Sequence, residues 1–161
     1  MKKSKTVRVC GSTEISKSKA QVFGFVATDF FTNYPKWALE VIKFKPPYFD
    51  GMTVGLQAKQ TRYDQGQESN TTIEVTCYTP QDEIDFKALD APFQESYYFS
   101  VLSDNSTQLT FCFELLEIDV FMRPFEKLIR RSIEEGIENS LSNICNLITN
   151  EQPSKVDFFP V

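Results

Sequence analysis

The chain has 161 residues, of which 41% are hydrophobic and 14% aromatic, and it contains no histidine. This length suits one domain with a sizeable core, and the net charge of −5 argues against nucleic acid as the main partner, because phosphate binding needs a basic surface. Without histidine, Ser-His-Asp and Cys-His catalysis and histidine-bound zinc are excluded, so any catalysis would depend on carboxylate, Tyr, Lys or Arg side chains.

The N-terminal part of the chain predicts one strand followed by two short helices. Apolar and polar residues alternate over residues 7–15, which is the period of a strand. An apolar stripe over residues 18–27 predicts an amphipathic helix. The next segment, residues 30–39, is dense in aromatic residues and is expected to be helical or irregular and to pack under the rim of a sheet.

The middle of the chain reads as a series of strands separated by turn signals such as Asp50-Gly51. Pro46-Pro47 restricts the strand before this turn to a sheet edge or an irregular end. Strands joined by short turns form an antiparallel sheet, and one apolar face of this sheet must be buried. With the N-terminal strand, the expected strands are residues 7–15, 41–49, 52–62, 71–78, 84–88, 94–102 and 107–118.

One long amphipathic helix is predicted over residues 123–149, because Ile and Leu recur there at helical spacing. Ser132, Gly136 and Ser140 form a second row of small residues on this helix. Such a row either lets a strand approach closely or leaves room for a ligand, and we prefer close packing.

Both ends of the chain are expected to lie outside the core. We interpret the basic start, with Lys2, Lys3, Lys5 and Arg8, as a solvated tail in preference to a membrane-surface anchor. Residues 150–161 are expected to be a flexible tail, although Phe158 and Phe159 could dock on the domain. The prediction is therefore a single domain over residues 1–161 with its core at about residues 7–149.

The four cysteines are widely spaced and contain no C-x-x-C pair, so we expect free buried thiols, no disulfide and no metal site. They are Cys10, Cys77, Cys112 and Cys145. No apolar stretch approaches the roughly 20 residues of a membrane span, and the N-terminus lacks the apolar segment of a signal peptide. We therefore expect a cytoplasmic protein with no integral membrane segment.

Several short motifs resemble those of the START-like superfamily. Glu14-Ile15 runs into the Val-Phe helix of residues 21–26, Tyr34-Pro35-Lys36-Trp37 follows, and Val54-Gly55 opens a later strand. The order of elements is also similar, most closely to the polyketide cyclase/dehydrase and lipid-transport families (SRPBCC, Bet v 1-like). This resemblance implies an α+β helix-grip fold. In that fold a curved antiparallel sheet of about seven strands wraps around a long C-terminal helix, with two short helices after the first strand.

The resemblance also implies a deep apolar cavity between the sheet and the long helix. Family members typically hold a lipid, sterol, polyketide, hormone or flavonoid there. A few are cyclases, dehydratases or hydrolases, and others act through protein partners. The implied cavity, the high aromatic content and the absence of histidine make a noncatalytic binder or carrier of a small hydrophobic ligand the leading hypothesis, and we expect no cofactor. The alternatives are a cyclase or dehydratase acting on a hydrophobic substrate, and a protein-interaction module whose partner is unknown.

The apolar alternation along each strand indicates which side chains face the helix. On residues 94–102 the inward set contains either Tyr97 and Phe99 or the alternating Tyr98, and we prefer the first because it is apolar. The expected ligand-binding residues are Trp37, Leu56, Arg62, Val75, Glu95, Tyr97, Phe99, Phe111 and Phe113.

Arg62 and Glu95 are the charged members of this set. Together with Tyr97 they would form a polar patch in an apolar cup, and an Arg–Glu pair there would be a ligand anchor or an acid/base site. The alternative is a salt bridge at the rim or two solvated side chains. Trp37 either gates the cavity or packs in the core. No catalytic residue is assigned from the sequence.

Overall fold

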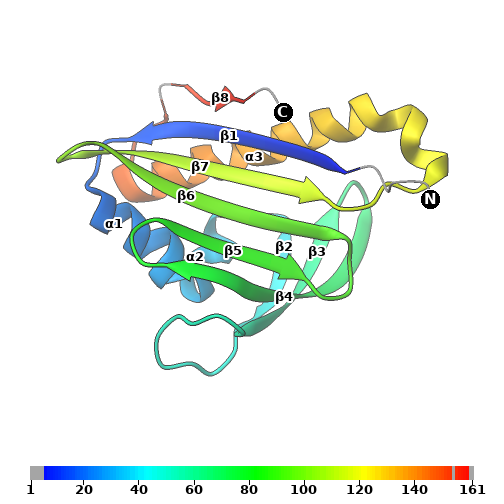
Figure 1. Ribbon diagram of the computed structural model, residues 1–161, viewed down its shortest axis with the longest axis horizontal. Coiled ribbons are helices and arrows are strands. Elements are labelled where there is room, and N and C mark those ends of the chain that lie inside the picture. The colour runs from blue at the N-terminus through cyan, green and yellow to red at the C-terminus, as the bar shows by residue number, and fades with distance from the viewer. Residues whose placement is uncertain (1–5, 154, 160–161) are drawn as a thin grey trace.

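One antiparallel sheet of eight strands curves around the helices of this α+β protein (Figure 1). The computed structural model describes residues 6–153 and 155–159. The strand order is β2-β3-β4-β5-β6-β7-β1-β8, so the first long strand lies beside the last long strand. This is the expected helix-grip arrangement, with an additional short strand from the C-terminal segment.

The seven expected strands are all present, and the eighth lies beyond the long helix. Their bounds are β1 Val7–Ile15, β2 Val41–Lys45, β3 Gln57–Asp64, β4 Gln67–Thr79, β5 Glu83–Ala88, β6 Phe93–Ser103, β7 Ser106–Leu115 and β8 Asp157–Phe158. The strand expected from residue 52 starts only at Gln57. Gly51 and Gly55 have left-handed backbone angles there, so the apolar alternation before Gln57 belongs to a loop that exposes Val54.

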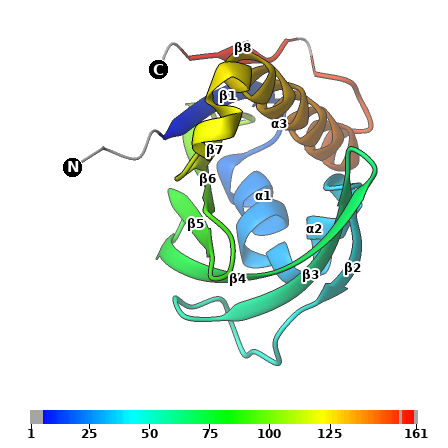
Figure 2. The same cartoon turned by 90° about the vertical axis from the view of Figure 1, so that its right-hand side faces the viewer.

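Two short helical segments follow β1. Ser18 and Gln21 form a capping box at the start of α1 (Lys19–Phe23), which continues as one π-helical segment, η1 (Gly24–Thr28). The aromatic segment forms α2 (Phe30–Trp37). In Figure 2 the strands form a curved wall around α1 and α2.

The long helix follows β7 through a 3-10 segment, η2 (Val120–Phe125), and spans 24 residues as α3 (Glu126–Thr149). It packs against β1, β7 and α2. Gly11 of β1 permits this approach, because a Cβ atom there would lie 2.8 Å from Cγ2 of the buried Ile137. Among the described residues, no helix is long and apolar enough to cross a membrane.

The C-terminal segment pairs with β1 in the structure, which differs from the expected flexible tail. Phe158 lies opposite Gly11 in an antiparallel register, and the Phe159 amide donates a 2.9 Å hydrogen bond to the Cys10 carbonyl. The Thr13 hydroxyl donates a further hydrogen bond of 2.8 Å to the Lys155 carbonyl. The segment docks because β1 offers backbone groups on its side away from β7. Of the basic start, Lys2, Lys3 and Lys5 lie outside the described residues, and Arg8 belongs to β1 rather than to a tail.

Cys10 and Cys112 form a disulfide between β1 and β7, with their Cα atoms 4.1 Å apart. The expectation of no disulfide is therefore wrong for this pair. The two cysteines are 102 residues apart in sequence, and they lie directly opposite each other only because the first long strand pairs with the last. Cys77 and Cys145 are free, as expected.

Candidate functional site

A cavity of about 650 Å³ lies between β3, β6, β7 and α3. Glu95 and Tyr97 of β6 and Phe111 and Phe113 of β7 line it on the sheet side, and Arg62 of β3 lines another part of its wall. These are five of the nine residues expected to bind a ligand. The structure therefore brings together the two charged residues and three of the aromatic residues of the predicted set.

The pairing of β6 with β7 explains why these side chains meet. Glu95 lies opposite Phe113 and Tyr97 opposite Phe111, and facing residues on neighbouring strands share one side of the sheet. The rings of Tyr97 and Phe111 stack with their centroids 4.5 Å apart. Glu95 and Tyr97 are only 5% and 1% exposed, while Tyr98 is half-buried, so the apolar register preferred for β6 is confirmed.

Arg62 is held at the cavity wall by three neighbours. Its Nη2 lies 2.9 Å from Oε1 of Glu40 and its Nε lies 3.1 Å from Oδ2 of Asp64, while its Nη1 donates a 3.2 Å hydrogen bond to the Tyr34 hydroxyl. The guanidinium is thus paired mainly with Glu40 and Asp64, and Glu95 acts on it through charge alone. Arg62 closes one end of the cavity as a fixed, already neutralised group.

Glu95 is the buried titratable group of the cavity. Burial raises the pKa of its carboxyl to about 7; the positive charge of Arg62 opposes this rise, and the negative charge of Glu40 adds to it. Burial and the charge of Glu95 also raise the pKa of Tyr34 and of Tyr97, so both phenols stay protonated. Near neutral pH the site therefore holds two phenolic donors and a carboxyl that can either donate or accept a hydrogen bond.

The helix side of the cavity is lined by the row of small residues on α3. Ser132, Gly136 and Ser140 all face the cavity, and no atom lies within 4 Å of where a Gly136 Cβ would be. The interpretation of this row as a close-packing surface is therefore wrong, and the alternative that it leaves space describes the structure. The close approach of α3 to the sheet occurs instead at Gly11 and Ile137.

The other four expected residues lie outside the cavity wall. Trp37, Val75 and Phe99 are buried in the core, and Leu56 packs half-buried against it. Trp37 fills the space under the sheet together with Phe30, with ring centroids 5.7 Å apart. The rings of α1 and α2 occupy the part of the cup that these residues face.

Three residues that contact Arg62 in the site, Tyr34, Glu40 and Asp64, were not predicted from the sequence. Tyr34 lies in the aromatic segment of residues 30–39, and the aromatic density of that segment did predict that it packs under the sheet. Glu40 follows α2 as an isolated acidic residue, and nothing in its sequence neighbourhood indicates that it pairs with Arg62.

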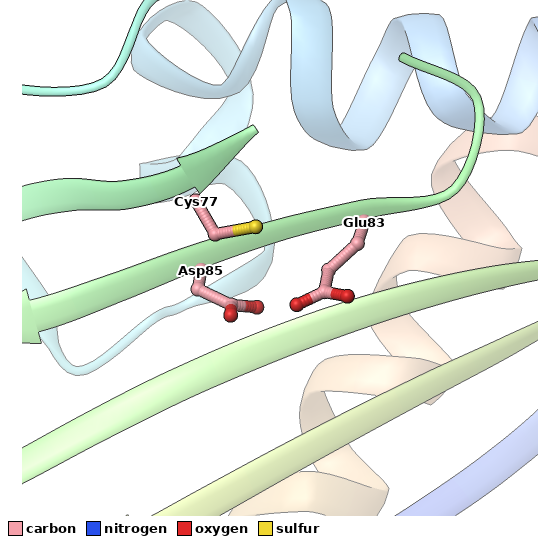
Figure 3. A group of neighbouring side chains, drawn as sticks. All are labelled: Cys77, Glu83 and Asp85. Atoms are coloured by element: carbon pink, nitrogen blue, oxygen red, sulfur yellow. The ribbon is translucent and has the colours of Figure 1, made fainter. Parts of the chain in front are cut away.

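A second group of polar side chains lies on the outer face of the sheet, away from the cavity (Figure 3). The ligand-type atoms of Cys77, Glu83 and Asp85 all lie within 4.8 Å of one another. Burial and a hydrogen bond with Glu83 raise the pKa of Asp85 to about 7. Oδ1 of Asp85 is buried and has no hydrogen-bond partner within the part of the chain that the structure describes, and we assign no cation to the group.

Comparison with known proteins identifies the fold. No model of a known protein family matches the chain, and no curated protein matches its sequence. Solved structures do match. The Zhui aromatase/cyclase of a Streptomyces species is 12% identical over 89% of this chain and 94% of that chain, with a TM-score of 0.74. A START superfamily protein of Mycobacterium smegmatis is 16% identical over 89% of this chain and 99% of that chain, with a TM-score of 0.70. Truncated norcoclaurine synthase of Thalictrum flavum is 12% identical over 94% of this chain and 99% of that chain, with a TM-score of 0.70. The chain therefore has the START-like, Bet v 1-like fold.

Proposed function

We propose that the protein binds a small, largely apolar molecule that carries a polar group, and that it does so in the cavity between the sheet and α3. The observation that carries this proposal is the Glu95 carboxyl, buried in an aromatic wall beside unfilled space. This carboxyl borders the cavity, where a ligand group can hydrogen-bond to it away from bulk water. The volume of about 650 Å³ suits a drug-sized ligand.

The charges around the cavity favour a neutral or cationic ligand. Four residues with carboxyl groups line the cavity, Glu40, Asp64, Glu95 and Glu135, against the one guanidinium of Arg62. Two of them already pair with Arg62, so this residue offers little attraction to a further anion. We therefore place the main polar contact at Glu95 and assign to Arg62 the fixing of Tyr34 and Glu40.

Binding of a neutral naphthalene dye tests this function. Gly136→Phe fills the space at the helix side of the cavity and is expected to weaken dye binding by about tenfold or more, which corresponds to about 1.4 kcal/mol. Glu138→Phe, at an exposed position of α3 outside the cavity, is the matched control and should bind as the wild type does. Equal affinity of Gly136→Phe and the wild type would contradict the proposal. A wild type that binds no apolar probe at all would favour the protein-interaction module.

An acid/base enzyme is the second candidate function, and the pKa of Glu95 favours it. A carboxyl with a pKa of about 7 is suited to proton transfer at neutral pH. Tyr97 lies on the same strand and the same face as a second proton donor. One of the similar structures is an aromatase/cyclase, which makes cyclisation or dehydration of a hydrophobic substrate the reaction to test.

Native mass spectrometry of the protein from its own host separates the two functions. A carrier releases the same compound from the wild type and from Glu95→Gln. An enzyme releases a product from the wild type and a precursor of different mass from Glu95→Gln.

A further inference from the structure

One end of the molecule exposes a cluster of large apolar side chains, which we call the apolar end. It lies on η2 and the start of α3 (Figure 1), and its members are Val120, Phe121, Met122, Phe125 and Leu128. Phe121 is 82% exposed and Leu128 66%. Contiguous exposed apolar surface of this kind marks a site of protein or membrane interaction.

Two exposed basic side chains, Lys127 and Arg131, lie beside the apolar end. Residues 120–131 contain four basic residues and one acidic residue, while acidic residues stand on either side of this stretch at positions 117, 119, 134 and 135. Lys127 is exposed, and Arg131 is 79% exposed, follows Leu128 by one helical turn and has its Nε 3.9 Å from Oε1 of the exposed Glu135, a surface pair that a lipid phosphate can replace. An apolar helix face beside exposed Lys and Arg is typical of a helix that lies in the interface of an anionic membrane.

The apolar end is continuous with the cavity. Met122, Phe125 and Leu128 line a groove of about 480 Å³. Four residues line both this groove and the cavity, namely Gln65, Phe113, Ser132 and Ile133. At their shared boundary the Gln65 side-chain amide donates a 2.9 Å hydrogen bond to the Ser132 hydroxyl, which joins the β3–β4 turn to α3.

We propose that the apolar end docks on a bilayer surface that contains anionic lipids, and that an apolar ligand passes between the bilayer and the cavity where the Gln65–Ser132 contact opens. Phe121, Phe125 and Leu128 enter the boundary between headgroups and acyl chains, while Lys127 and Arg131 contact the lipid phosphates. The docking part of this proposal depends only on the exposed side chains of the apolar end and does not require a ligand in the cavity. The passage of ligand rests on the function proposed above.

Cosedimentation of the full chain with lipid vesicles tests the docking. We expect the protein to bind phosphatidylcholine vesicles that contain phosphatidylglycerol. Its affinity for vesicles of phosphatidylcholine alone should be lower by about tenfold or more. The paired substitution Phe121→Ser with Phe125→Ser should reduce binding about tenfold or more, as should Lys127→Glu with Arg131→Glu. All four positions are exposed, so thermal unfolding should be unchanged.

Two control variants carry the same kinds of change elsewhere. Val101→Ser with Leu102→Ser removes exposed apolar side chains from the end of β6 beside its turn to β7, at the opposite end of the sheet. Lys45→Glu with Lys59→Glu reverses an exposed basic pair on β2 and β3. Both controls should bind vesicles as the wild type does.

Several outcomes would overturn the proposal. One is no binding to anionic vesicles, and another is an equal or larger loss in either control. A third is a dimer in size-exclusion chromatography that Phe121→Ser disperses, because the surface would then join two copies of the chain. Dye binding without vesicles is measured separately, so vesicle binding with an empty cavity would reject the ligand function and keep the docking surface.

Discussion

The concave face of the sheet is filled on one side and open on the other. On the filled side, the Phe30 ring stacks on Phe86 at 4.0 Å and on Tyr34 at 4.6 Å between centroids. On the open side, α3 presents Gly136 and Ser140 to the cavity. The same sheet face serves both sides, so the size of the helical side chains opposite it decides where the fold packs solidly and where it leaves space.

The largest expected effect separates two neighbouring positions of α3. Ile137 is 1% exposed and packs on Gly11, so Ile137→Asp should abolish folding, since an unpaired buried charge costs several kcal/mol, roughly. Ile133 is half-buried at the cavity wall, where water can reach a carboxylate, so Ile133→Asp should fold with a lowered melting temperature. Circular dichroism melts compare the two, and a folded Ile137→Asp would contradict the packing described.

Removing one aromatic ring from each side tests the comparison directly. Phe30→Ala should lower the free energy of unfolding by about 3–5 kcal/mol, because the ring leaves a cavity among packed neighbours. Phe113→Ala should cost less than half of that, because its ring already borders open space. Urea unfolding measures both, and similar losses would mean that the two sides are packed alike.

The pH dependence of stability reports on Glu95. Its folded pKa lies at about 7, above the ordinary value of 4.5, so its stabilising contribution is full below pH 4.5 and is lost as pH rises to about 7. At about 1.36 kcal/mol per pKa unit, this loss is at most about 3 kcal/mol. Glu95→Gln should remove it.

The test is the difference in unfolding free energy between Glu95→Gln and the wild type at pH 5 and pH 8. The groups that act on the Glu95 charge, Arg62 and Glu40, are present in both proteins, as is Asp85, which also titrates near pH 7. A constant difference across this range would show that Glu95 is ionised throughout.

The smallest expected effect compares two glycines: Gly136 of α3, which borders the cavity, and Gly11 of β1, which lies at the close contact with α3. Gly136→Ala should raise the free energy of unfolding by about 0.4–1 kcal/mol, because its helical backbone suits alanine and its Cβ meets nothing within 4 Å. Gly11→Ala should instead destabilise the protein, since its Cβ would meet Ile137 at 2.8 Å. Thermal unfolding should therefore shift in opposite directions, and a destabilised Gly136→Ala would mean that this part of the helix is tightly packed.

The strand pattern predicted the fold and one wall of the cavity. Alternation placed Glu95 and Tyr97 on the inner face because that face of β6 is buried, and burial is what the pattern reports. It failed before Gln57, where left-handed glycines turn an alternating stretch into a loop. Alternation within one segment carries no information on the backbone angles between its residues.

Contacts between distant segments were beyond the sequence. The disulfide of Cys10 with Cys112 and the pairing of Arg62 with Glu40 depend on which elements become neighbours. The position of the cavity also depends on which elements become neighbours. Phe99 carries the same strand alternation as Phe111, but its ring packs on Phe23 of α1 while Phe111 borders the cavity. The placement of the short helices therefore decides which inward residues are covered by rings.

The docked C-terminal segment has a consequence for how the protein behaves at high concentration. β2 and β8 are the two edges of the sheet, and β2 is a short strand followed by Pro46-Pro47. The C-terminal segment covers residues 10–13 of β1, and without it this middle part of β1 would become an open edge whose free backbone groups can pair with another chain. We therefore expect residues 155–159 to limit edge-to-edge aggregation, and a protein shortened after Glu151 to precipitate at a lower concentration than the full chain.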